Sequence, residues 1–316
     1  MDLRKLHHMV VLSEELNFAK AANKVHLTQS ALSRSIQNLE QELGGKLFDR
    51  DLHGVALTVI GRQVVSRARE LLLQARNLQH EINLMQKSEL GNVKLGAGPF
   101  PGATFLPPIL AELTREHPRL CVETEINDTG YLLQHLHAEK IEFFVADVRS
   151  IPPDTKLSIQ LLARQFGAFF CHPAHPLLAK PIEHVSEVLA YPMLTVHMPD
   201  GIKAELKRFL GLTEIQELNF SLICNNPAVL DYVAQHSDAI LVSTFAVVGD
   251  DIAAGKLVPL TIPNHPTLFA EMGIVKLAGR SLSPTGDWIV TRMQHYADQL
   301  AEQYSLENIA QWWPGF

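Results

Sequence analysis

The chain has 316 residues, of which 47% are apolar and 19% charged, and its net charge is −7. This composition excludes a largely disordered protein, and the length allows two or three domains of roughly 100–150 residues. Residues 1–90 hold 12 Lys and Arg against 10 Asp and Glu, a net of +2, whereas residues 91–316 hold 15 against 24, a net of −9. A strongly basic nucleic-acid-binding protein is excluded, so any DNA contact must come from a local patch in the N-terminal part.

The longest apolar run, residues 239–248, is about half the roughly 20 residues of a membrane-spanning helix. Glu14 and Glu15 interrupt the N-terminal segment, which argues against a signal peptide. We therefore expect a cytoplasmic protein without a membrane partner.

The first 45 residues predict three short helices. Apolar residues recur at helical spacing in residues 3–16 and in residues 18–26, and the third helix lies between the N-cap Thr28 and the stop at Gly44. The apolar stripe of the third helix consists of Leu32, Ile36, Leu39 and Leu43. Two helices joined by a short turn, the first of them rich in alanine, predict a helix-turn-helix.

The polar face of the third helix lacks the Glu and Lys pairs of an ordinary solvated helix. It carries amides, hydroxyls and one guanidinium, and its first acidic residue is Glu40. Amides can pair with adenine and arginine with guanine, whereas carboxylates would be repelled by phosphate. A solvated polar face is the alternative, but the whole set behind a capped turn favours DNA contact. The predicted DNA-contacting residues of this helix and its cap are Thr28, Gln29, Ser30, Ser33, Arg34 and Gln37.

Residues 46–58 alternate apolar positions around a glycine, which predicts a two-stranded wing. Lys46, Arg50 and His53 would contact the DNA backbone there. Apolar residues then follow steps of four and three in a helix of about 28 residues, roughly 42 Å long. The same helix of a second chain is the simplest partner, and packing on its own C-terminal domain is the alternative. The predicted dimerisation residues are Val64, Ala68, Leu71, Ala75, Leu78 and Ile82.

Beyond residues 88–92 strands alternate with helices, which predicts an α/β fold with parallel strands. We expect two lobes, lobe I at about 92–163 and 267–303 and lobe II at about 164–266. A ligand would bind between them at the carboxyl ends of the strands. The aromatic tail at 306–316 is expected to dock on its own lobe, and a contact between subunits is the alternative.

Residues 18–50, FAKAANKVHLTQSALSRSIQNLEQELGGKLFDR, resemble the DNA-binding motif of LysR-type transcriptional regulators, and the match continues through LT-x-x-G at 57–61. The resemblance implies a winged helix-turn-helix at 1–58, a dimerising linker helix at 59–88 and a periplasmic-binding-protein-like effector domain at 89–305. It also implies operator DNA and a small-molecule effector as partners, a homodimer or homotetramer, RNA polymerase as a candidate partner, and no cofactor. Where the family usually has an arginine near the wing tip, this chain has His53.

In LysR-type regulators four loops at the cleft bind the effector, which is often a small carboxylate. The loop GAGPFPGAT (96–104) should line the cleft with backbone amides, and Gly98 and Phe100, where a hydroxyl is common, suggest a less polar or aromatic effector. Arg149 would supply a countercharge, or would pair with Asp147 or Asp154. The effector-binding residues that the resemblance implies are Gly98, Phe100, Gly102, Thr104, Thr129, Arg149, Thr195, His197 and Asn226.

The sequence contains no catalytic or metal-binding motif of the kinds GxSxG, HExxH or CxxC, and we expect Cys121, Cys171 and Cys224 to be buried thiols. Two other functions are a solute-binding module of transport and an enzyme with an appended DNA-binding domain. The helix-turn-helix argues against the first, and the missing catalytic set against the second. The sequence therefore predicts a DNA-binding transcriptional regulator, not an enzyme, that is gated by an effector between two lobes.

Overall fold

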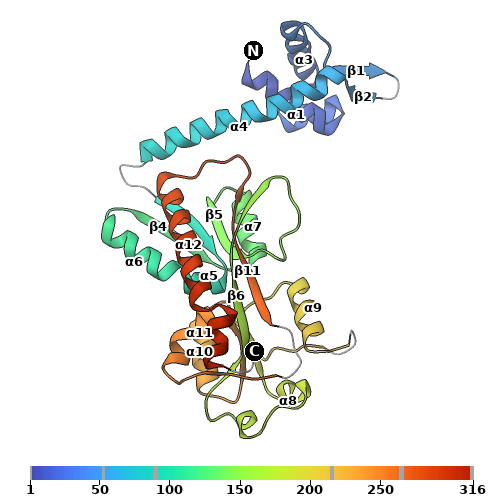
Figure 1. Ribbon diagram of the computed structural model, residues 1–316. Coiled ribbons are helices and arrows are strands. Elements are labelled where there is room, and N and C mark those ends of the chain that lie inside the picture. Colours follow the sequence, from blue (N-terminus) through green and yellow to red (C-terminus); the bar gives the residue numbers. More distant parts are fainter. Residues whose placement is uncertain (1, 52–53, 88–91, 214–216, 263–266, 314–316) are drawn as a thin grey trace. The chain divides into compact units, whose positions relative to one another are not determined.

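The computed structural model of the chain (Figure 1) describes residues 2–51, 54–87, 92–213, 217–262 and 267–313. It separates into two compact units, which are Met1–Gln86 with Gly279–Ser281 (unit 1) and Lys87–Ala278 with Leu282–Phe316 (unit 2). Among the described helices, none combines the length and the apolar character that a membrane span requires.

Unit 1 begins with the helices α1 (Leu3–Glu15), α2 (Phe18–Lys24) and α3 (Gln29–Leu43). A side-chain oxygen of Asp2, Asn17 or Thr28 accepts a hydrogen bond from the first turn of each helix, which satisfies a backbone amide that has no partner within the helix. These caps explain why the chain forms three separate helices here, and the predicted helix-turn-helix is confirmed.

The wing is a hairpin of β1 (Phe48–Asp51) and β2 (Gly54–Leu57), in which Phe48 is paired with Leu57. Leu47 and Phe48 are buried, as the alternating pattern predicts. Arg50 lies in β1, but its side chain, like all of His53, falls outside the described part of the structure. Their predicted DNA contacts therefore remain predictions.

Helix α4 (Val59–Lys87) changes its surroundings along its length. Its first turns complete the core of unit 1, where Val64 packs and Ala68 is 1% exposed. Farther along, Leu71 and Leu78 are 41% and 58% exposed. Ala68 therefore packs inside the core that α1–α3 and the wing share, and it cannot contact a partner helix.

Unit 2 is built on a nine-stranded sheet in the order β4-β3-β5-β11-β6-β9-β7-β8, with β10 paired to β6. The strands are β3 (Asn92–Ala97), β4 (Cys121–Ile126), β5 (Phe143–Asp147), β6 (Leu157–Cys171), β7 (Met193–Thr195), β8 (Leu222–Ile223), β9 (Ile240–Thr244), β10 (Val258–Pro259) and β11 (Leu268–Leu277). The predicted parallel pairing holds for β3 with β4 and β5, and for β7 with β8 and β9. Cys121, expected to be buried, is exposed because β4 is an edge strand.

The two long strands β6 and β11 pair antiparallel and run through both lobes (Figure 1). The expected boundary between the lobes, at about residues 163–164, lies inside a single strand, because residues 157–171 form the continuous strand β6. Its register with β11 extends from Leu157↔Leu277 to Gly167↔Leu268, so hydrogen bonds to a distant segment create this strand. The lobes therefore share one sheet.

Helices cover this sheet. They are α5 (Pro99–Thr104), α6 (Leu106–Glu116), α7 (Thr129–His137), α8 (Val185–Leu189), α9 (Asp200–Phe209), α10 (Pro227–Gln235), α11 (Phe245–Ala253), α12 (Pro284–Gln303) and α13 (Leu306–Trp312), with a 3-10 turn at Pro176–Ala179. Two differ from expectation: residues 99–104 form a short helix instead of a loop, and the tail begins with α13. Proline suits the first turn of a helix, and Ser305 caps α13.

The tail docks on its own chain, as expected, but it packs against lobe II and not against lobe I, which contains the preceding helix α12. Ile309 is fully buried, and the Trp313 ring lies 5.5 Å from the ring of Phe245. The Trp313 indole N–H donates to Thr261 Oγ1 at 3.0 Å, which satisfies its polar atom. The side chain of Trp312 and residues 314–316 lie outside the described residues.

Candidate functional site

Helix α3 presents the predicted polar face to solvent. Gln29, Ser30, Arg34 and Gln37 are exposed, and Ser33 is half-buried. On the opposite side Leu32, Ile36 and Leu39 are fully buried, whereas the fourth residue of the predicted stripe, Leu43, is 40% exposed. The apolar stripe thus fixes the rotation of α3, and most of the polar row faces solvent.

The start of α3 is held by Thr28. Its Oγ1 accepts a hydrogen bond from the Ala31 amide at 3.2 Å and lies 3.2 Å from Ser30 Oγ. This arrangement positions the hydroxyls of Thr28 and Ser30 before any DNA binds, which lowers the entropy cost of binding.

The carboxylates of α3 are engaged within unit 1. Glu40 Oε1 accepts hydrogen bonds from the amides of Leu47 at 2.9 Å and Phe48 at 3.2 Å, and so fixes the entry into the wing. Glu42 forms an ion pair with Lys5, and this hydrogen bond lowers the pKa of Glu42. Neither acid belongs to the exposed row in the first turns of α3.

A shallow hollow between α1 and α3 adds basic residues that the sequence analysis did not assign to DNA. It is lined by Asp2, Arg4, Lys5, His8, Ser30, Ala31, Arg34, Ser35 and Asn38. Arg4 is 88% exposed and contacts Asp2 only at 3.6 Å, so its guanidinium remains accessible. His8 is held by Ser35 at 2.8 Å, and burial lowers its pKa. The basic pair Arg4-Lys5 in the first turn of α1 was the available sequence signal.

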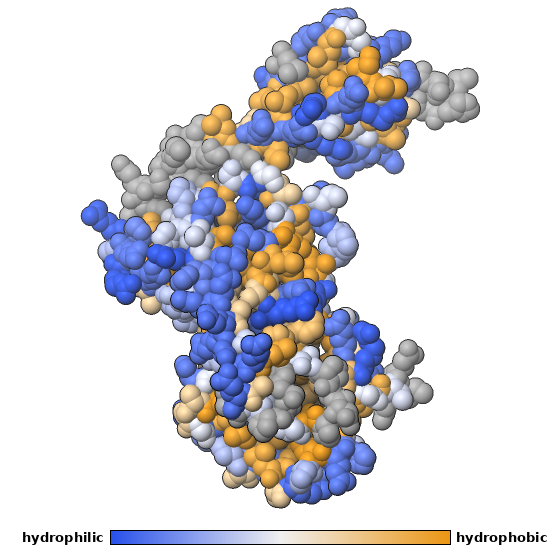
Figure 2. Space-filling model, in the orientation of Figure 1, coloured by the Kyte–Doolittle hydropathy of each residue, from blue (hydrophilic) through white to orange (hydrophobic). Residues whose placement is uncertain are grey.

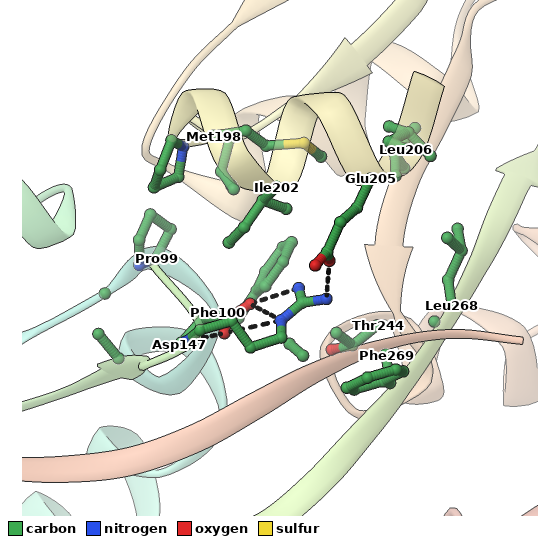
Figure 3. A pocket seen from close by; sticks show the side chains of 18 of the residues that line it. Pro99, Phe100, Asp147, Met198, Ile202, Glu205, Leu206, Thr244, Leu268 and Phe269 are labelled. Carbon is green, nitrogen blue, oxygen red and sulfur yellow. Dashed lines mark hydrogen bonds and ion pairs between the residues drawn. The ribbon is translucent and has the colours of Figure 1, made fainter. Parts of the chain in front are cut away.

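Unit 2 contains a cavity of about 490 Å³ that lies between its lobes (Figure 3). Residues that follow β3, β5 and β7 contribute, together with the last residues of β9, helix α9 and the start of β11, so the carboxyl ends of parallel strands meet there as predicted. Its apolar lining includes Pro99, Phe100, Pro101, Ala146, Val196, Met198, Pro199, Ile202, Leu206, Phe209, Val242, Leu268, Phe269, Ala270 and Met272. Figure 2 shows hydrophobic residues also reaching the surface in the middle of unit 2, with hydrophilic residues around them.

Arg149 is the central charged group of this cavity. Its guanidinium donates to Asp147 at 2.6 Å and to Glu205 at 3.1 Å, shown by the dashed lines in Figure 3. Burial opposes the charged form, but these two carboxylates outweigh it and raise the pKa of Arg149. The pairing with Asp147 confirms one of the two expectations, and Glu205 adds a link from lobe I to α9 of lobe II.

The cavity brings together five of the predicted effector residues, namely Gly98, Phe100, Thr129, Arg149 and His197. The others do not line it. Gly102 packs against Ile126, Thr104 Oγ1 donates to the Phe100 carbonyl at 3.0 Å, Thr195 is 1% exposed within β7, and Asn226 caps α10. The sequence analysis missed Ile202, Glu205 and Arg208 of α9 and Phe269 of β11, because only the fold brings them to the strand ends.

The start of α5 is poor in hydrogen-bond donors. Pro99 and Pro101 occupy the first and third helical positions and have no N–H, so Phe100 alone offers a free amide there. The Gly98 amide is already bonded to the Val145 carbonyl at 2.7 Å. The expectation that amides of this segment line the cleft is therefore wrong for all but Phe100.

Comparisons with known proteins agree with this architecture. A family model described as bacterial regulatory helix-turn-helix protein, lysR family, matches residues 3–62, and one described as LysR substrate binding domain matches residues 86–300. The chain is 38% identical over 290 residues to the SDS degradation transcriptional activation protein of Pseudomonas sp., covering 90% of this chain and 93% of that one. It is 32% identical over 185 residues to the transcriptional regulator EstR of Acinetobacter baylyi, covering 58% and 60%.

Two solved structures share the fold. Corynebacterium glutamicum OxyR is 18% identical with a TM-score of 0.53, covering 96% of this chain and 95% of that chain. The full-length regulator LysG of the same organism, with its bound effector Arg, is 14% identical with a TM-score of 0.52, covering 95% and 99%.

Proposed function

The chain belongs to the LysR family of DNA-binding transcriptional regulators, and from this premise we propose that α3 binds operator bases while the cavity of unit 2 holds the controlling effector. The family assignment makes it a regulator with a helix-turn-helix and an effector-binding domain. The proposal concerns which residues perform these two tasks.

The exposed row of α3 carries the proposal for DNA binding. It offers amide, hydroxyl and guanidinium groups, and the nearest acids are engaged by Lys5 and by the amides before the wing. Thr28, Gln29, Ser30, Ser33, Arg34 and Gln37 are the proposed contacts. Arg4, Arg50 and His53 would contact phosphates, which positions the domain without selecting a sequence.

We further propose that two chains associate through α4 and bind an inverted repeat. The exposed Leu71 and Leu78, with the half-buried Ala75 of the same seam, are the surface that supports this. The side chain of Ile82 falls outside the described part of the structure, so its contact remains a prediction. In a homodimer or a homotetramer, a change in lobe closure would alter the spacing between DNA-binding domains. RNA polymerase would be the partner at the promoter. The protein would act in the cytoplasm and without catalysis.

The effector is proposed to be a largely apolar small molecule. The cavity falls within the roughly 300–1,000 Å³ of typical small-molecule sites, and apolar side chains dominate its lining. The relative from Pseudomonas sp. is named for SDS degradation, and SDS is an alkyl sulfate. Alkyl compounds are therefore the first class to test.

Replacement of Arg34 by alanine tests the DNA-binding proposal. We expect Arg34→Ala to weaken operator binding by roughly 1–3 kcal/mol per half-site, because a bidentate guanine contact is lost. Operator fragments selected with the wild-type protein would be titrated by gel shift at fixed salt. The matched control is Arg115→Ala, which removes the same charge from exposed α6. Equal affinity of the two variants would rule out Arg34 as a base contact.

A further inference from the structure

In the lining of the unit 2 cavity, the apolar side chains and the charged side chains occupy different positions. Phe100 from α5 and Ile202 and Leu206 from α9 approach it from different elements, and Leu268 and Phe269 close another side (Figure 3). An apolar body of several carbons would gain roughly 0.8 kcal/mol per buried CH₂ group in such surroundings. This lining favours a chain or ring over a small polar ligand.

The buried guanidinium does not offer a free positive charge. Arg149 lies between Asp147 and Glu205, so the three groups together carry a net charge of −1. A further carboxylate or sulfate placed there would approach two carboxylates and would be repelled. An anionic headgroup is therefore disfavoured in the deep part of the cavity.

The start of α5 does not offer an alternative anion-binding site to Arg149. Pro99 and Pro101 remove two of the three amides with which a helix start could bind an anion, and the cavity wall becomes apolar there. Asp128 lines the cavity on the side of lobe I and caps α7 with its carboxylate. This negative charge would repel an anion.

Arg208 is the remaining cation of the lining. It lies on α9 and is exposed, and no hydrogen bond or ion pair engages its side chain within the described residues. On a helix, Arg208 lies one turn beyond Glu205, on the side facing the same cavity. The cavity lining therefore combines an apolar majority with one exposed guanidinium that no side chain of the described residues pairs with.

From this separation we propose that the effector is a single-headed amphipathic anion, with its apolar chain inside the cavity and its sulfate or carboxylate headgroup on Arg208. The inference rests on the proposed function of the cavity and adds the class of effector and its orientation. His197 of lobe II, which also lines the cavity, is the candidate for a second headgroup contact.

Calorimetric titration of the full chain tests this assignment. The probes are decyl sulfate, decanoate, decan-1-ol and succinate, each below its micellar concentration where it forms micelles. We expect one decyl sulfate or decanoate per chain, weaker binding of decan-1-ol, and none of succinate. Arg208→Gln should weaken both anions about three- to tenfold, as expected for a charge-assisted hydrogen bond at an exposed site, and leave decan-1-ol unchanged.

Two variants complete the design. Ile202→Trp should abolish binding of every probe because the indole fills the cavity, and Arg115→Gln should change nothing. If Ile202→Trp blocks binding but Arg208→Gln leaves decyl sulfate unaffected, the headgroup assignment is overturned and the effector cavity stands. If a probe binds equally well to Ile202→Trp, or no probe binds at all, the amphipathic effector is rejected. Operator footprinting with a bound probe then tests the regulatory function separately.

Discussion

Arg34 of α3 and Arg149 of the cavity have opposite surroundings. Arg34 is exposed and has no ion pair within the described residues, while the side chain of Arg149 is 17% exposed and held by Asp147 and Glu205. An arginine kept clear of acids can meet an external phosphate or base, whereas one between two carboxylates organises its own fold. The residue type alone thus does not identify a binding site; its partners do.

The largest effect should follow removal of the paired arginine. We expect Arg149→Met to lower the free energy of unfolding of unit 2 by about 2–3 kcal/mol, because Asp147 and Glu205 lose their shared cation and repel each other. Chemical denaturation followed by circular dichroism measures this loss.

Arg164→Met is the matched control for that change. Arg164 also pairs with a carboxylate, Glu271 at 3.0 Å, and also lies over the Phe269 ring, but its side chain is 55% exposed. The loss should stay below about 1 kcal/mol, as for a surface pair. Equal losses in the two variants would contradict a special structural role for the largely buried ion pairs of Arg149.

Replacement of Glu40, which links α3 to the wing, should have the next largest effect on stability. Glu40→Ala removes the acceptor for the Leu47 and Phe48 amides and should destabilise unit 1 by about 1–2 kcal/mol. Glu40→Gln keeps an acceptor oxygen and should lose less. If both variants retain full stability and operator affinity, Glu40 has no role in fixing the entry into the wing.

Asp231 on α10 differs from these paired groups. Among the residues that the structure describes, no hydrogen-bond partner reaches its buried Oδ1, and burial, followed by the charge of Asp251, raises its pKa to about 7. The folded protein therefore holds this proton more tightly than the unfolded chain, so its stability falls as pH rises from about 4 to about 7.

Asp231→Asn removes this titration. Allowing for partial solvent screening, the variant should be more stable than the wild type by about 1 kcal/mol at pH 8 and closely matched near pH 4. Melting temperatures measured across this range report the difference. A constant offset at every pH would show that the titration of Asp231 does not contribute.

Local patterns predicted unit 1 well. The spacing of Leu32, Ile36 and Leu39 identified the buried side of α3, and Thr28 and Gly44 marked its ends. The same reasoning failed for β6, whose residues 157–165 lack a clear strand pattern and become a strand by pairing with β11, about a hundred residues away. It also assigned Ala68 to a partner helix, since a heptad seam does not show where the chain's own core ends.

The candidate sites divide in the same way. Local periodicity and capping determined the polar face of α3, because one helix carries the whole row and its apolar stripe sets the orientation. The strand–helix alternation predicted a site at the carboxyl ends of strands in unit 2, and the resemblance named four loops there, of which the one with Asn226 does not line the cavity. Only the tertiary structure decided the electrostatics of the cavity, because it placed Glu205 from α9 on Arg149, more than fifty residues away, and gave Arg208 no ion pair with any residue of the described part of the chain. Charge pairing depends on distances of a few ångströms between separate elements, and no local pattern encodes them.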